Sequence, residues 1–180
     1  MTDEDLKFMN LALELAKKAE LKDEVPVGAV IVQDGKVIGS GMNTSISDHD
    51  PTSHAEINAI REAAKLIQNY RLKDCSIYVT LEPCSHHGKT PPCANAIVAS
   101  GIARVVVAVA DPDPRVSGRG LKILADADIE VTIGILQKEA RRAMAGYLTR
   151  QTKGRPQVTL KLAVSADGML GRNHFIVAHK

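Results

Sequence analysis

The chain has 180 residues, a formal charge of +2, 44% hydrophobic residues and only 3% aromatic residues. This length suits one domain with at most a short additional segment, and the hydrophobic content is sufficient for a core that folds without disulfides. The small charge gives no indication of a polyanionic partner, and the scarcity of aromatic residues argues against extended stacking of single-stranded nucleic acid.

The N-terminal sequence MTDEDLKFMN is acidic and lacks the basic region and apolar run of a signal peptide. No apolar stretch approaches the ~20 residues that are needed to span a bilayer. We therefore expect a cytoplasmic protein without membrane association, in which the three cysteines are reduced.

Helical and strand patterns follow one another through the first half of the chain. Apolar residues at helical spacing after an acidic first turn predict a helix over residues 4–20. The segment 27–38, with the two-residue turn Asp34-Gly35 inside it, predicts a hairpin. The segment 39–53 is rich in Gly, Asn, Ser and Asp and is predicted to be a loop, and a second helix is predicted to start near residues 52–54.

The second half alternates strands with helices. Pro92 is expected to open a helix that ends at Gly101, and the apolar run 104–110 suits a strand buried on both faces. The other predicted elements are a strand over 76–81, a helix over about 119–127, a strand over 129–135 and a helix over 137–149. This order predicts an α/β fold, a three-layer α/β/α sandwich around a central mixed sheet, with residues 1–150 as its domain.

The segment 151–180 follows a different pattern. After Gly154-Arg155-Pro156, the apolar residues of 158–164 predict one more strand. One strand cannot form a domain by itself. We therefore interpret 151–180 as a linker and the first strand of a further domain that the chain lacks.

Three short motifs contain the residues typical of a catalytic zinc site: His54-Ala55-Glu56, Pro83-Cys84 and Pro92-Cys93. Each lies at a predicted helix start or strand end, where α/β sheets place their ligand crevice. Zinc prefers Cys and His ligands, and a catalytic site supplies three of them and leaves a fourth position for water. One histidine and two cysteines form such a set, so we predict that His54, Cys84 and Cys93 bind Zn²⁺.

Glu56 lies two residues after His54, within reach of a metal-bound water without being a ligand itself. A carboxylate there can take a proton from water and return it to a ring nitrogen and to the departing amine. Hydrolytic deamination requires such a shuttle, because ammonia leaves poorly until it is protonated. The structural alternatives are an ordinary helix start at His54 and a disulfide between Cys84 and Cys93.

The motifs resemble those of the cytidine-deaminase-like superfamily, whose zinc signature is H-x-E followed by P-C and a second Cys. The first half of the chain is similar to bacterial tRNA adenosine deaminases, in the segments 24–30, 49–56 and 69–72 and at Asn43. The part from Cys84 onward resembles the deaminase half of bifunctional riboflavin-biosynthesis deaminase/reductases, in the segments 84–93, 111–120 and 161–168. The resemblance implies the cytidine deaminase fold, Glu56 as the catalytic residue, and a missing reductase-like domain after 151–180, so we expect no NADPH-dependent reduction.

The loop between the two cysteines distinguishes the two resemblances. Eight residues separate Cys84 from Cys93, a longer spacing than in the tRNA enzymes, and such a loop would stand over the metal and reshape the pocket mouth. Its histidines and lysine suit a phosphorylated small molecule, although a solvated loop lysine is the plain alternative for Lys89. The substrate-binding residues that the resemblance implies are Asn43, His86, Lys89 and Asp113.

The sequence departs from the riboflavin enzymes at three positions. Val25 stands where an Asn is usual, Asn43 where a His is common, and Asp113 where an Asn is common. These departures affect the expected substrate contacts and leave the predicted metal ligands unchanged.

The first interpretation is a Zn²⁺-dependent hydrolytic deaminase that acts on diaminohydroxyphosphoribosylaminopyrimidine in riboflavin biosynthesis, as a homodimer. The alternatives are a tRNA-specific adenosine-to-inosine deaminase and an inactive structural zinc-binding protein. The loop after Cys84 favours the first, the motifs of the first half favour the second, and the intact Glu56 argues against the third.

Overall fold

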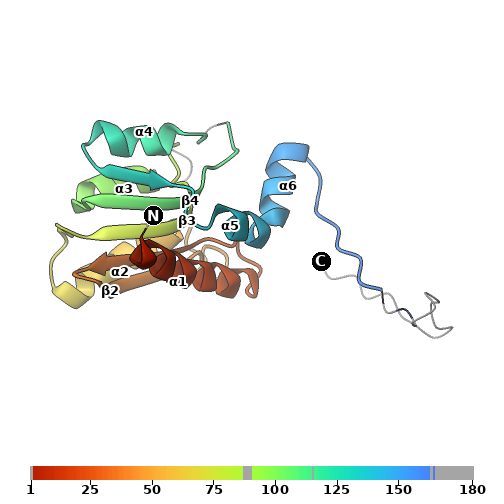
Figure 1. The fold of residues 1–180 in the computed structure, drawn as a ribbon, viewed down its shortest axis with the longest axis horizontal. Coiled ribbons are helices and arrows are strands. Elements are labelled where there is room, and N and C mark those ends of the chain that lie inside the picture. Colours follow the sequence, from red (N-terminus) through yellow and green to blue (C-terminus); the bar gives the residue numbers. More distant parts are fainter. Residues whose placement is uncertain (1, 87–90, 115, 163, 165–180) are drawn as a thin grey trace.

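The computed structural model describes residues 2–86, 91–114, 116–162 and 164. Within them, five strands form one sheet in the order β2-β1-β3-β4-β5, and helices cover both of its faces (Figure 1). The strands are β1 (Gly28–Gln33), β2 (Lys36–Met42), β3 (Ser76–Leu81), β4 (Arg104–Val109) and β5 (Glu130–Ile133). The helices are α1 (Asp3–Glu20), α2 (Ala55–Ile67), α3 (Cys93–Ser100), α4 (Arg119–Asp126), α5 (Gln137–Ala143) and α6 (Ala145–Lys153). The predicted three-layer α/β/α sandwich is confirmed.

The sheet is mixed. Strand β1 runs antiparallel to both of its neighbours, β2 and β3, whereas β3, β4 and β5 are parallel to one another. Helices α1 and α5 pack against one face, and α2, α3 and α4 form the layer on the other. The three central strands are therefore buried on both sides, which explains why their sequences are apolar runs without polar alternation.

Strand β2 is longer than the sequence indicated. The prediction of a loop from residue 39 is wrong, because β2 continues to Met42 and pairs with β1 along that length. Gly39 and Gly41 lie directly beneath α2, where an added Cβ would overlap the backbone carbonyls of Ala59 and Ala55. These glycines allow α2 to pack closely on β2. In the sequence alone, a strand that is rich in glycine for this reason has the composition of a loop.

The C-terminal part also differs from expectation. The predicted helix 137–149 is two helices that meet at the buried Met144, and β5 ends at Ile133, before Gly134 with its positive φ of 97°. The described residues of 158–164 belong to no strand, so the prediction of a strand there is wrong for them. Their apolar side chains are exposed, and a strand does not persist without a hydrogen-bonding neighbour.

A network of charged groups joins α1 to the amino ends of β3 and β4. The buried Asp5 accepts hydrogen bonds from Arg104 at 2.8 Å and from the Tyr78 hydroxyl at 3.2 Å. Arg104 also donates to Glu130 at 2.9 Å and to Thr132 at 3.2 Å. Hydrogen bonding to Arg104 is the main reason why the pKa of Asp5 lies well below its usual value.

No helix in the described part of the chain is both long enough and apolar enough to cross a membrane.

Candidate active site

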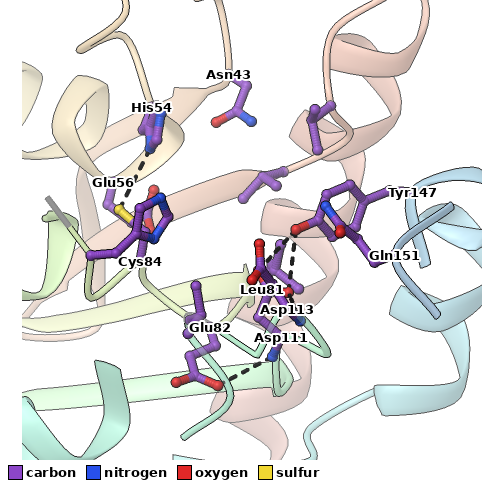
Figure 2. A pocket seen from close by; sticks show the side chains of 14 residues that line it. Asn43, His54, Glu56, Leu81, Glu82, Cys84, Asp111, Asp113, Tyr147 and Gln151 are labelled. Atoms are coloured by element: carbon purple, nitrogen blue, oxygen red, sulfur yellow. Dashed lines mark hydrogen bonds between the residues drawn. The ribbon is translucent and has the colours of Figure 1, made fainter. Parts of the chain in front are cut away.

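The site lies at the carboxyl ends of the parallel strands β3 and β4. Because these ends meet at the same edge of the sheet, Cys84, three residues after β3, comes close to Asp111, two residues after β4. His54 is the N-cap residue of α2 and Cys93 is the first residue of α3. His54, Cys84 and Asp111 thus line one pocket (Figure 2), and the Cys93 sulfur lies 3.3 Å from His54 Nδ1.

His54, Cys84 and Cys93 form a group that could hold one metal ion. Their ligand atoms all lie within 4.8 Å of one another, and the Cys93 sulfur is 3.3 Å and the Cys84 sulfur 4.0 Å from His54 Nδ1. Ligands on one tetrahedral zinc ion are separated by about 3.5–3.8 Å. Both cysteines are free thiols, which removes the disulfide alternative.

The electrostatics of the two thiols also suit a cation. Hydrogen bonding between them lowers the pKa of Cys84 and raises that of Cys93, and burial further raises the latter. The Cys93 backbone N–H, at the start of α3, also donates to the Cys84 sulfur at 3.2 Å. Two sulfurs that compete for one negative charge are the kind of donor set that a divalent ion such as zinc satisfies.

Glu56 lies beside this group, in the first turn of α2. Its side chain is 4% exposed and lines the pocket. Burial, with the neighbouring Cys84 thiolate, raises the pKa of its carboxyl to about 7. Such a group exchanges protons readily near neutral pH, as an acid–base catalyst must.

Asn43 fixes the start of α2. Its side-chain oxygen accepts a hydrogen bond from the Ala55 N–H at 2.9 Å, whereas the N-cap residue His54 makes no capping bond of its own. The orientation of the turn that carries His54 and Glu56 therefore depends on a side chain from the end of β2. Asn43 lines the pocket as well, so its predicted contact with substrate remains a prediction beside this structural role.

The sequence analysis overlooked Glu82. This buried residue accepts hydrogen bonds from four backbone N–H groups: those of Asp111 at 3.2 Å, Gly118 at 3.0 Å, Gly120 at 3.1 Å and Leu121 at 3.5 Å. It thereby ties the strand end before Cys84 to the loop after β4 and to the start of α4. An acidic residue directly after a buried strand, next to a predicted ligand, was the available signal.

The pocket extends from the metal-binding group to a second wall of polar residues. Figure 2 shows the 14 residues that line it, and the cavity has a volume of about 260 Å³. Val25 and Val27 contribute apolar surface, and the second wall consists of Asp111, Asp113, Tyr147 and Gln151. The last two come from α6, which the sequence analysis did not connect with the site.

The predicted substrate-binding residues are placed as follows. Asp113 is buried in the second wall, and its N–H donates to Asp111 Oδ1 at 2.9 Å. His86 lines the pocket, and its buried Nδ1 has no hydrogen-bond partner among the described residues. Lys89 lies outside the described residues. A buried ring nitrogen without a partner is costly unless a ligand or water satisfies it, so the position of His86 is in keeping with its predicted role.

The chain is similar in sequence to a deaminase family and to proteins of riboflavin biosynthesis. The family profile described as "Cytidine and deoxycytidylate deaminase zinc-binding region" matches residues 2–109. "Riboflavin biosynthesis protein RibD" of Aquifex aeolicus is 44% identical over 168 residues, which are 92% of this chain and 45% of that protein. The chain thus spans less than half of this relative. "Diaminohydroxyphosphoribosylamino-pyrimidine deaminase" of Buchnera aphidicola is 39% identical over 84% of this chain and 99% of that protein.

Solved structures of a RibD protein and of a tRNA deaminase superpose on this chain. A RibD structure from Acinetobacter baumannii superposes with a TM-score of 0.80 at 42% identity, over 92% of this chain and 44% of that chain. A structure from a study of tRNA:A34 deaminases, which edit A to I, superposes with a TM-score of 0.66 at 35% identity, over 76% of this chain and 98% of that chain. Both predicted resemblances are therefore confirmed.

Proposed function

We propose that this chain, which belongs to the cytidine and deoxycytidylate deaminase zinc-binding family, hydrolytically deaminates diaminohydroxyphosphoribosylaminopyrimidine. The observation that carries the proposal is a buried carboxylate, Glu56, which lines a pocket beside the convergent His54–Cys84–Cys93 group. The substrate is proposed from the Buchnera deaminase, which aligns with this chain over 99% of its own length. Since the alignment covers nearly all of the Buchnera protein, a protein with that name consists of little more than the region that it shares with this chain.

The chemistry follows from the residues of the pocket. Zinc, when bound by His54, Cys84 and Cys93, supplies the Lewis acidity that makes water nucleophilic at neutral pH. Glu56 takes a proton from the attacking water and delivers it to the ring nitrogen next to the reacting carbon. The same carboxylate then takes the proton of the newly added hydroxyl and gives it to the exocyclic amine, so that the C–N bond breaks with release of ammonia and the hydroxyl-bearing carbon becomes a carbonyl.

The polarity of the pocket suits a ring with several hydrogen-bond donors. Asp111 and Asp113 supply acceptors opposite Glu56, whereas no lysine or arginine is found among the described residues that line the cavity. Amino groups and ribosyl hydroxyls would be recognised there. We assign the phosphate to the part of the pocket that His86 lines, because Lys89 follows His86 closely in the sequence.

A second candidate is deamination of adenosine in tRNA. It is favoured by the likeness to the tRNA:A34 deaminase structure, which this chain covers almost completely. The long segment between Cys84 and Cys93 and the higher identity to riboflavin-biosynthesis proteins favour the first proposal.

Ammonia release by the zinc-loaded chain separates these candidates. We expect release from the pyrimidine phosphate and none from an adenosine-containing anticodon stem-loop. The opposite result would assign the tRNA reaction. A chain that binds one zinc per molecule and releases ammonia from neither compound would be a structural zinc protein.

We also propose that the chain is a cytoplasmic enzyme and forms a homodimer. We further propose that the segment after α6 leads into a reductase-like domain, whose sheet would supply the hydrogen-bonding neighbour that 158–164 needs to form a strand. The domain proposal is supported by the alternating apolar residues of 158–164 and by the larger size of the RibD relatives. Light scattering after gel filtration measures the oligomeric state, and a monomer would contradict the first of these proposals.

A further inference from the structure

One wall of the pocket depends on a helix that lies outside the residues matched by the family profile. Tyr147, in the first turns of α6, packs its ring against the hydrophobic core. Its hydroxyl donates to the carboxylate of Asp111, with distances of 3.0 Å to Oδ2 and 3.2 Å to Oδ1 (Figure 2). The two residues are 36 positions apart and both line the cavity.

Asp111 organises the loop at the end of β4. Its Oδ1 accepts the Asp113 N–H at 2.9 Å, and its own N–H donates to Glu82 at 3.2 Å. The residue is only 6% exposed, so its carboxylate has little access to bulk water. The Tyr147 hydroxyl therefore replaces solvent as a donor to a buried charge, and hydrogen bonds to buried charges are the strong ones.

The hydroxyl is suited to act as a donor. Burial and the negative charge of Asp111 raise the pKa of Tyr147 above its usual value, so the phenol keeps its proton throughout the neutral range. The position of the ring is set by the junction at Met144, which is fully buried and ends α5 immediately before α6 begins.

We propose that Tyr147 is a positioning residue of the substrate pocket: its hydroxyl holds the Asp111 carboxylate, and through it the 111–113 turn, in the orientation that accepts a donor group of the substrate. The expected effect of Tyr147 on catalysis rests on the proposed deaminase function. Its structural part, the restraint of Asp111 and Asp113 by Tyr147, is independent of which compound the enzyme deaminates.

The test compares Tyr147→Phe with Tyr70→Phe. The first substitution removes the hydroxyl and keeps the ring. The second is the matched control, because Tyr70 is 67% exposed and does not line the pocket. For Tyr147→Phe we expect the KM for the pyrimidine phosphate to rise about tenfold, with kcat changed less than about threefold and one zinc per chain retained. Tyr70→Phe should leave all three quantities unchanged.

A measurement without substrate separates this inference from the proposed function. In Tyr147→Phe the backbone amide of Asp113 should exchange its hydrogen faster, since its acceptor is no longer held, whereas Tyr70→Phe should not alter that rate. Unchanged exchange at Asp113 would overturn the positioning role. If exchange accelerates but wild-type protein releases no ammonia from the pyrimidine phosphate, the proposed substrate fails and the positioning role stands.

Asp111→Ala provides the coupling test. If Tyr147 acts through Asp111, Tyr147→Phe in the Asp111→Ala background should raise KM no further, because the acceptor is already gone. Independent, multiplicative effects of the two substitutions would contradict the proposal. A rise in KM accompanied by an equal fall in kcat and by zinc loss would indicate general damage to the fold and would also contradict it.

Discussion

Buried charge lies at both ends of β3 and β4, and the two ends differ in how that charge is balanced. At the amino end, the carboxylate of Asp5 faces the guanidinium of Arg104, which also meets Glu130. At the carboxyl end, Glu56 and the two thiols lie beside His54, and no lysine or arginine is found among the described residues that line this pocket.

This difference separates a structural cluster from a functional one. Opposite charges in contact satisfy each other, and the pKa of Asp5 falls. At the carboxyl end, the hydrogen bond with Cys84 raises the pKa of Cys93, and burial, followed by the charge of Cys84, raises the pKa of Glu56. Such a cluster of acidic groups is stable only if something else supplies positive charge. The unbalanced end is therefore the one expected to bind a cation and to react.

Removal of a ligand should have the largest effect. We expect Cys93→Ala to lose its zinc and to reduce ammonia release by more than about 10⁴-fold, because water then keeps its ordinary acidity. Cys75→Ala is the control, since Cys75 is equally buried but lies outside the site; it should keep both zinc and activity. Metal analysis and an ammonia assay measure this, and stoichiometric zinc in Cys93→Ala would show that the ligand set is wrong.

Removal of the Glu56 carboxylate should lower the rate of deamination without changing the amount of bound zinc. In Glu56→Gln we expect kcat to fall by about 10²–10⁴-fold while zinc content is unchanged. Glu62→Gln is the matched control on the same helix, where the carboxylate is exposed and bonds to Ser40. Near-normal turnover in Glu56→Gln would remove Glu56 from the mechanism.

At the other end of the strands, the expected effect is on stability alone. Asp5→Asn leaves Arg104 without its closest partner and should lower the free energy of unfolding by about 3 kcal/mol, with kcat unchanged at 25 °C. The exposed pair Lys122–Asp126 provides the control, because Asp126→Asn should cost less than about 0.5 kcal/mol. Urea denaturation of the three proteins tests this, and equal losses in both variants would show that burial of the Asp5 pair has no special importance.

The smallest expected effect is a change, at acidic pH, in how much Asp5 contributes to the free energy of unfolding. Because the pKa of Asp5 is lower in the folded than in the unfolded chain, its contribution to stability is complete above about pH 4 and is lost as the pH falls through the folded value. The difference in unfolding free energy between wild type and Asp5→Asn should therefore be constant from pH 5 to 7, within about 0.5 kcal/mol, and should narrow below about pH 4. A difference that stays constant down to pH 3 would mean that Asp5 is not held ionised by Arg104.

Local sequence signals were sufficient for many elements. The strand 76–81 and the helix between Pro92 and Gly101 have the bounds that their apolar run, proline and glycine indicate. The metal-binding group could also be foreseen, because few roles require a histidine and two cysteines at strand ends and helix starts. The extension of β2 could not, since Gly39 and Gly41 look like loop residues until α2 is placed above them.

The sequence by itself determined the α/β alternation, the three candidate ligands and the carboxylate beside them, because each depends on residue type and short-range spacing. Only the tertiary structure decided the second wall of the pocket. Glu82 and Tyr147 act on the loop after β4 from 29 and 36 residues away along the chain. No periodicity connects such positions, since their contact exists only when parallel strands align their ends and a later helix folds back across them.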